Sequence, residues 1–356
     1  MSSLDKLPIR SDLKGLEPYG APQLDVAVQL NVNENTFGIP ESVAISIVEK
    51  LAQATIGLNR YPDREFMELR GAIAQYLGKG LAPEQIWAAN GSNEILQQFF
   101  TVFGGPERKA MSFGPTYSMY PNIARGTLTN YSELPREAGF ELSPEYLAAE
   151  IAKEKPDVVI LCTPNNPTGN SISLEAIAAA YDAFDGMLLV DEAYQEFSSQ
   201  ESAISLLPSR ERLVVSRTMS KAFAFAGARL GYMASHTAVV NAMRLVRLPY
   251  HLSSLTQAAA LAAIEHSGDL LATVEQIKVQ RERISAAAVE FGLTVQPSDA
   301  NFVLVSGVKD PEAIFEKLLE RGVLIRNVGI PNSLRLTAGT EAETTKLIAE
   351  LGLLLD

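Results

Sequence analysis

The sequence predicts an α/β protein: a large part with a mostly parallel central sheet flanked by helices, followed by a smaller α+β part. The segments 157–162, 187–190 and 213–216 are almost continuously apolar, which is typical of strands buried on both faces. Strand and helix patterns alternate between about residue 86 and residue 232. This alternation indicates a parallel sheet with crossover helices.

The remaining elements divide the chain into three parts. Residues 1–40 are rich in proline, asparagine and glycine and contain one short strand pattern at 26–30, which predicts an irregular arm that packs on the small domain or on a partner. After the alternating region the pattern is helical at 238–248, 254–266 and about 269–291, and then gives a strand at 300–305, a helix at 311–322, strands at 323–326 and 333–337 and a final helix. We therefore expect an arm (1–40), a large domain (41–267) and a small domain (268–356).

Composition excludes several classes of function. The net charge of −12, from 30 basic and 42 acidic residues, argues against general nucleic-acid binding. No apolar run reaches the roughly 18 residues of a membrane span, and the first residues lack the apolar core of a signal peptide. The single cysteine, Cys162, rules out an intrachain disulfide and fits a reducing, cytoplasmic location. The three histidines have no ligand-like spacing, so we expect no metal site: His236, His251 and His266.

The first candidate site residues follow the strand pattern at 86–89. The turn Asn90–Glu94 leads into a helix, and backbone N–H groups at such a junction suit a phosphate. A simple N-cap by Ser92 or Asn93 is the alternative. Farther along the chain, Tyr117 lies in a proline-containing turn at the end of a strand, where it can stack on a planar ring or pack in a local apolar cluster.

Two more turns follow predicted strands, at the position where open parallel α/β sheets bind ligands. One is the rigid turn 163–169, and the other begins at Asp191. An acid that ends an apolar strand lowers stability unless it is paired. Asp191 is therefore interpreted as a functional residue.

Lys221 follows the strand 213–216 directly. Thr218 and Ser220 precede it closely, and Arg229 comes one loop later. A lysine amine is nucleophilic only when deprotonated, and apolar neighbours and a nearby cation favour that state. Hydroxyls and a guanidinium beside it suit a phosphate. The combination indicates a Schiff-base lysine serving pyridoxal 5′-phosphate, whereas a surface lysine with ordinary serine neighbours is the alternative.

Two arginines occur in apolar strand patterns of the small domain, Arg326 and Arg335. An arginine in a strand is usually a solvated edge residue, but two of them in one small domain favour an anion site.

These segments together resemble the histidinol-phosphate aminotransferases, a family of fold-type-I pyridoxal-phosphate enzymes, and are particularly similar to the actinobacterial members. The resemblance covers nearly the whole chain in the family's order. It is carried by NEN (33–35), RYPD (60–63), GSNE (91–94), PTYSMY (115–120), TPNNPTG (163–169), DEAY (191–194), SRTMSKAFAFAGARLGY (216–232), RLPY (247–250), ANF (300–302) and RLTAGT (335–340).

The resemblance implies roles for the residues that match these motifs. Lys221 would bind the cofactor covalently and then shuttle a proton, Asp191 would hold the pyridinium proton, and Asn166 with Tyr194 would hydrogen-bond the 3′-oxygen. Tyr117 would stack on the ring. The residues that would hold the cofactor phosphate are Gly91, Ser92, Asn93, Thr218, Ser220 and Arg229, with Tyr61 reaching it from the partner subunit of a homodimer with shared sites.

The same resemblance implies the substrates. Arg335 would pair with the substrate carboxylate and Asn33 would assist, while Arg326 and Tyr19 would be candidates for the substrate phosphate. The expected reaction moves an amino group between histidinol phosphate and 2-oxoglutarate in histidine biosynthesis. NENT in place of NENP and YGAP in place of Y-x-P-G are departures in the arm that faces the substrate.

Other activities use the same kind of site. An aromatic aminotransferase acting on phenylalanine or tyrosine is the nearest alternative, and a decarboxylase of a phosphorylated amino acid is a more distant one. A regulatory domain that only senses cofactor would need an attached DNA-binding module, and the first forty residues are too short and too weakly helical for one.

Overall fold

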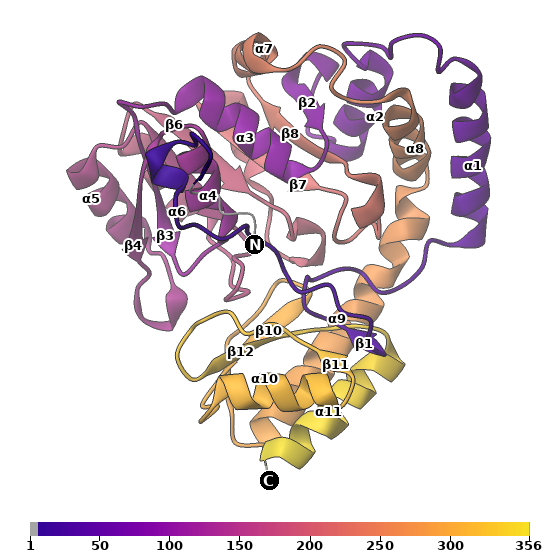
Figure 1. Cartoon of the computed structure of the whole chain (residues 1–356). Coiled ribbons are helices and arrows are strands. Elements are labelled where there is room, and N and C mark those ends of the chain that lie inside the picture. The colour runs from indigo at the N-terminus through magenta and orange to yellow at the C-terminus, as the bar shows by residue number, and fades with distance from the viewer. Residues whose placement is uncertain (1–5, 356) are drawn as a thin grey trace.

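A computed structural model describes residues 6–355. Seven strands form the central sheet in the order β2-β8-β7-β6-β5-β3-β4 (Figure 1). β8 runs antiparallel to both of its neighbours, whereas the other pairs are parallel. The strands are β2 (Ile86–Ala89), β3 (Lys109–Gly114), β4 (Asn130–Pro135), β5 (Val158–Cys162), β6 (Met187–Asp191), β7 (Leu213–Thr218) and β8 (Gly231–Ser235). The predicted mostly parallel sheet is confirmed.

The middle of the sheet sets the position of the site. β5 and β7 are buried along their whole length and β6 nearly so, in agreement with their apolar sequences. In the register of these strands, Cys162 lies beside Asp191 and Asp191 lies beside Ser216. Because all three strands run in the same direction, the segments that follow them emerge at one edge.

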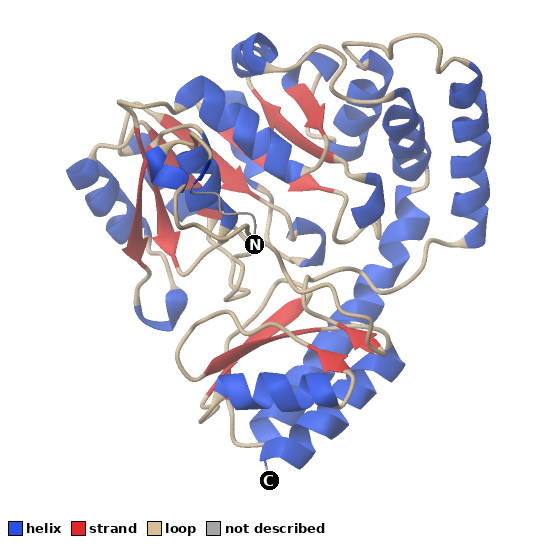
Figure 2. Cartoon of the chain, in the orientation of Figure 1, coloured by secondary structure: helices blue, strands red, loops and turns tan. Residues whose placement is uncertain are grey.

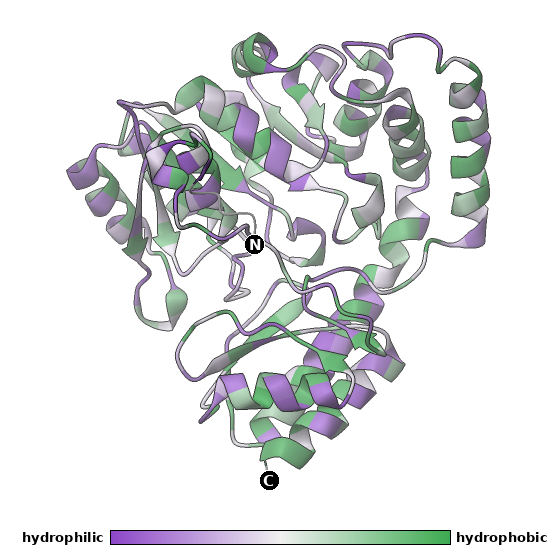
Figure 3. Cartoon of the chain, in the orientation of Figure 1, coloured by the Kyte–Doolittle hydropathy of each residue, from purple (hydrophilic) through white to green (hydrophobic). Residues whose placement is uncertain are grey.

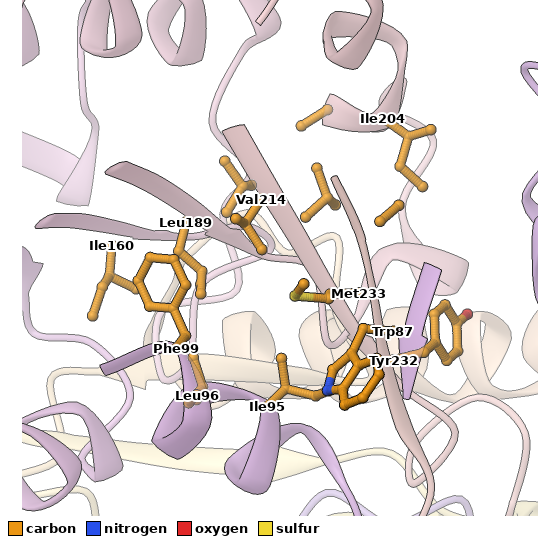
Figure 4. Close-up of a cluster of buried hydrophobic side chains, with 14 of the residues drawn as sticks. Trp87, Ile95, Leu96, Phe99, Ile160, Leu189, Ile204, Val214, Tyr232 and Met233 are labelled. Atoms are coloured by element: carbon orange, nitrogen blue, oxygen red, sulfur yellow. The ribbon is translucent and has the colours of Figure 1, made fainter. Parts of the chain in front are cut away.

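Helices cover the sheet (Figure 2). They are α1 (Glu41–Ile56), α2 (Met67–Leu77), α3 (Ser92–Phe103), α4 (Met119–Gly126), α5 (Pro144–Glu154), α6 (Leu174–Asp182), α7 (Thr237–Val246) and α8 (Ser254–Glu265). α3 packs on β7 and β8, and Figure 4 shows Ile95, Leu96 and Phe99 directed at side chains of the strands. This apolar contact fixes the N-terminus of α3 at the edge of the sheet where the site lies.

A second apolar core lies in the C-terminal part. β10 (Phe302–Ser306) pairs antiparallel with β12 (Ser333–Thr337) and with β9 (Thr294–Val295). Around them lie α9 (Ser267–Glu290), α10 (Pro311–Glu320) and α11 (Glu341–Leu355). α9 runs from the large sheet down to the small one (Figure 1). The expected boundary near residue 267 stays a prediction.

The N-terminal arm joins the C-terminal part through one short strand pair. β1 (Val28–Gln29) pairs in parallel with β11 (Val323–Leu324). Both are shorter than the predicted strands at 26–30 and 323–326. Arg326 therefore lies beyond β11, where it forms an isolated bridge with Arg335.

Several elements have no counterpart in the prediction, among them β4, β8, α4 and α5. β4 is an edge strand with exposed and half-exposed residues, so its sequence lacks the apolar signature of the buried strands. β8 begins at Gly231, inside a segment rich in glycine and alanine. Within residues 6–355, none of the helices combines the length and the apolar character that crossing a membrane requires.

Candidate active site

A cavity of about 250 Å³ lies where the ends of β5, β6 and β7 meet the start of α3, the arm and the C-terminal part. Fourteen of the predicted site residues line it: Tyr19, Asn33, Ser92, Asn93, Tyr117, Asn166, Asp191, Tyr194, Thr218, Ser220, Lys221, Arg229, Arg326 and Arg335. Segments that are far apart in the sequence therefore converge on one pocket. Among the described residues, no three His, Cys, Asp or Glu side chains are grouped as a metal site.

Asp191 is the buried acid of the cavity, with 3% of its surface exposed. Tyr120 donates a hydrogen bond of 2.8 Å to its Oδ2, and Ser216 donates one of 3.2 Å to its Oδ1. Burial raises the pKa of Asp191 to about 6, and the two hydrogen bonds oppose that rise because they favour the ionised form. Asp191 can therefore act as a carboxylate close to neutral pH.

Lys221 is the amine of the same cavity. Its Nζ donates a 2.7 Å hydrogen bond to the backbone carbonyl of Val32, which belongs to the arm. Burial lowers the pKa of Lys221 to about 8, and the positive charges of Arg335 and Arg229 act in the same direction. A substantial fraction of this amine is thus deprotonated near neutral pH, which a Schiff-base nucleophile requires.

A polar cradle surrounds the N-terminus of α3. Gly91 precedes the helix with φ of 88°, and a Cβ placed on it would lie 2.4 Å from Nη2 of Arg229. Arg229 donates a 3.3 Å hydrogen bond to Oγ of Ser220. Gly91 is the N-cap, and no side chain in the described part of the chain caps the helix, so the alternative of an N-cap by Ser92 or Asn93 is wrong. Helix-start amides, hydroxyls and a guanidinium together form a site for a phosphate.

Side chains above the sheet edge form a hydrogen-bonded layer. Tyr117 donates to Oδ1 of Asn93 at 3.2 Å. Asn33 donates to the hydroxyl of Tyr194 at 2.9 Å and accepts a 2.7 Å bond from Thr337. This layer connects the arm, the large sheet and β12, which agrees with the prediction that Asn33 and Tyr194 share one site.

Arg335 is the buried cation of the cavity, only 6% exposed, although it lies on a strand. It donates to Oδ1 of Asn166 at 2.8 Å and to the carbonyl of Asn31 at 2.7 Å. Its Nε is buried without a hydrogen-bond partner in the described part of the chain. A buried guanidinium in the lining of a cavity favours an anionic ligand over a solvated edge arginine.

Two predicted residues lie outside the cavity lining. Gly91 is adjacent to it through Arg229. Tyr61 is 79% exposed and stacks on Tyr250, with ring centroids 4.4 Å apart. Tyr61 is not part of the candidate phosphate cradle of its own chain, and a role for it needs a second copy.

Sequence reasoning missed Tyr120, Ser216 and the carbonyls of Asn31 and Val32. Tyr120 lies three residues after Tyr117, in the first turn of α4, and the sequence pattern does not reveal this helix. The carbonyl contacts depend on how the arm folds back, which no local pattern reveals.

The cavity fits pyridoxal 5′-phosphate by its donor set. Asp191 supplies an anion for a ring nitrogen, Lys221 an amine for an aldehyde, and the start of α3 a cradle for a phosphate. Together with the mostly parallel sheet, this arrangement defines the fold-type-I class of pyridoxal-phosphate enzymes. Within that class, the chain belongs to the family described as aminotransferase class I and II, whose family model matches residues 25–351.

Curated relatives resemble the chain along its whole length. A histidinol-phosphate aminotransferase of Paenarthrobacter aurescens is 56% identical and covers 100% of this chain and 97% of its own. One of Thermobifida fusca is 50% identical, with 96% and 94% covered. Among solved structures, the histidinol-phosphate aminotransferase of Sinorhizobium meliloti in complex with pyridoxal-5′-phosphate is similar, with a TM-score of 0.84 and 28% identity over 93% of this chain and 91% of that one.

Proposed function

We propose that the protein is a pyridoxal-phosphate-dependent histidinol-phosphate aminotransferase, which interconverts histidinol phosphate and 2-oxoglutarate with imidazole-acetol phosphate and glutamate. The observation that carries this proposal is the shared cavity of Lys221, Asp191 and Arg335. Asp191 and Arg335 are buried, Lys221 is half-buried, and each has the charge type that the reaction needs. The full-length likeness to histidinol-phosphate aminotransferases supports the substrate.

The cofactor site uses the polar layer of the cavity. Asp191 would face the ring nitrogen, Asn166 and Tyr194 the 3′-oxygen, and Tyr117 the ring face. Ser92, Asn93, Thr218, Ser220 and Arg229, with the backbone at Gly91, would hold the phosphate. When bound, the cofactor supplies an aldehyde that accepts the amino group and a ring that withdraws electrons from the substrate Cα.

Lys221 is the group that moves protons in this proposal. With a pKa lowered to about 8, its amine accepts a proton from the substrate Cα and returns it at the next step. The carbonyl of Val32, 2.7 Å away, orients the amine when it is free.

Arginines recognise the two ends of the substrate. The position of Arg335 in the cavity lining supports binding of a carboxylate, with Asn33 in the same lining. Arg326 and Tyr19 lie in the lining and would take the substrate phosphate or the second carboxylate of glutamate. Ser118 donates a 3.2 Å hydrogen bond to the hydroxyl of Tyr19, which fixes that ring.

A homodimer with shared sites is part of the proposal, as is a cytoplasmic location. The exposed apolar side chains on α1 and on the segment around residue 248 support an interface: Ile45, Val48, Ile56, Leu58, Leu245 and Leu248. Apolar turns of α1 are visible at the right edge of Figure 3. Tyr61 belongs to this exposed region, from which it would reach the phosphate site of the partner.

Substrate comparison tests the proposed function. With 2-oxoglutarate as acceptor, we expect kcat/KM for histidinol phosphate to exceed that for phenylalanine, tyrosine or unphosphorylated histidinol by at least about 100-fold, because one desolvated arginine–phosphate contact contributes about 3 kcal/mol. Arg326→Gln should remove most of this preference while leaving kcat/KM for unphosphorylated histidinol, which reports only the half-reaction with the amino donor, nearly unchanged. Faster turnover of phenylalanine would establish the aromatic alternative, and release of CO2 without any acceptor would establish a decarboxylase.

A further inference from the structure

Tyr120 contacts Asp191, the proposed catalytic acid, from outside the cavity lining. Its hydroxyl donates to Oδ2 of Asp191 at 2.8 Å, the shorter of the two side-chain hydrogen bonds that this carboxylate receives. The side chain of Tyr120 has 0% exposure and does not belong to the cavity lining. It therefore has no access to substrate or cofactor and acts only through Asp191.

The surroundings of Asp191 destabilise its negative charge. The carboxylate is buried, Glu192 follows it directly in the chain, and the thiol of Cys162 faces it from β5. Tyr117 lies nearby in the same cavity. Glu192 is neutralised by an ion pair of 2.9 Å with Arg217, and burial keeps the thiol of Cys162 protonated by raising its pKa to about 12. Tyr120 and Ser216 are thus the side chains that stabilise the charge on Asp191.

We propose that Tyr120 is a positioning residue that keeps Asp191 ionised and directed at the cofactor ring nitrogen. This inference rests on the role proposed above for Asp191. A hydrogen bond from a neutral donor to an ionised acceptor is stronger than one to the neutral acid, so it favours the carboxylate. It also fixes one of the two oxygens, which leaves the carboxylate a single orientation.

The position of Tyr120 is itself fixed by α4. Its ring meets the ring of Tyr117 edge-on, with centroids 5.5 Å apart and an angle of 86° between the planes. Tyr117, proposed to pack on the cofactor ring, lies just before α4, and Tyr120, which contacts the acid at the ring nitrogen, lies in the first turn of α4. A displacement of α4 would disturb both contacts together.

The test is the pH dependence of the holoenzyme in Tyr120→Phe. Without the hydroxyl, the pKa of Asp191 rises, so we expect the acid limb of kcat/KM for histidinol phosphate to move up by about one pH unit. With the pKa of Asp191 near 6 in the wild type, this shift is a loss of about fivefold at pH 6 and approaches tenfold only at lower pH. Ser216→Ala removes the longer hydrogen bond and should give a smaller shift in the same direction.

Tyr232→Phe is the matched control. Tyr232 is also completely buried, but its hydroxyl has no hydrogen-bond partner among residues 6–355, so its profile should coincide with that of the wild type. A Tyr120→Phe enzyme that is folded by circular dichroism and either unchanged or reduced equally at every pH would overturn the role of Tyr120. A wild-type enzyme without transamination would instead refute the proposed function itself, which keeps the two failures separate.

Discussion

Burial acts on the two central residues of the site in opposite ways. It lowers the pKa of Lys221 to about 8 and raises that of Asp191 to about 6, because a charge is disfavoured away from water whatever its sign. For Lys221 the effect is useful, since the neutral amine is the reactive form. For Asp191 it is adverse, and hydrogen bonds from Tyr120 and Ser216 oppose it.

The rate at which the apoprotein captures pyridoxal 5′-phosphate should report the state of Lys221. Capture needs the neutral amine, so the rate should rise with pH and level off above about 8, where an ordinary lysine would still be charged. Arg335→Gln removes a positive charge that lowers this pKa and should move the midpoint to higher pH. Stopped-flow absorbance after mixing measures the rate.

Arg326→Gln serves as the control for that experiment, because Arg326 lines the same cavity but is not among the charges that shift Lys221. Its midpoint should equal that of the wild type. A midpoint near 10 in the wild-type apoprotein would contradict the lowered pKa.

The junction of β2, Gly91 and α3 is the element on which the phosphate cradle depends. Gly91→Ala would place a methyl group 2.4 Å from Nη2 of Arg229, so the guanidinium must move. We expect the Kd for pyridoxal 5′-phosphate to rise at least about tenfold, as the loss of one charge-assisted hydrogen bond predicts. Titration of the apoprotein, followed by fluorescence, measures Kd.

Gly78→Ala is matched to this change, because Gly78 also has a positive φ, of 66°, but among residues 6–355 no atom lies within 4 Å of the place its Cβ would take. Both variants should lose about 1–3 kcal/mol of stability, because the backbone at Gly91 (φ 88°, ψ 162°) and at Gly78 (φ 66°, ψ −141°) lies in a region that essentially only glycine adopts. Only Gly91→Ala should lose cofactor affinity. Equal Kd values for the two variants would show that the Gly91–Arg229 approach has no part in binding.

The elements that could be predicted from the sequence are those with a strong local pattern. The strands that end at Cys162 and Asp191 are apolar over nearly their whole length, and the strand that ends at Thr218 is apolar in its first half. The burial of these strands could therefore be predicted from their composition. α4 was missed because it is short and contains Pro121 near its start. Tyr120 lies on α4, so its role was missed as well. Its contact with Asp191 joins residues that are 71 positions apart in the sequence.

The contacts that complete the site belong to the whole molecule. The carbonyl of Val32 meets Lys221 across 189 positions, and Arg335 meets the carbonyl of Asn31 across 304. Such contacts arise only after the arm packs between the two cores, so hydrophobic periodicity carries no information about them. The family resemblance predicted the residues involved, but not these backbone partners.

At the scale of the assembly, the exposed position of Tyr61 predicts complementation between defective subunits. Lys221→Ala and Tyr61→Ala should each be nearly inactive alone. In a dimer with shared sites, the mixed dimer combines the Lys221 of one subunit with the Tyr61 of the other and has one intact site. Unfolding and refolding the two variants together should therefore restore about a quarter of the wild-type activity, since half of the dimers are mixed.

Activity assays and light scattering on the refolded mixture, with each variant refolded alone as the control, measure this outcome. A dimeric mixture that stays as inactive as its parents would contradict the sharing of Tyr61.

The proposal that Lys221, Asp191 and Arg335 act together in one cavity is most directly tested by a single half-reaction. Histidinol phosphate is added to the cofactor-loaded protein without 2-oxoglutarate, and the absorbance of the cofactor is followed. Our account predicts complete conversion of the cofactor to its amine form, reversal on addition of 2-oxoglutarate, and neither change in Lys221→Ala. An unchanged spectrum of the wild-type protein at saturating histidinol phosphate would contradict it.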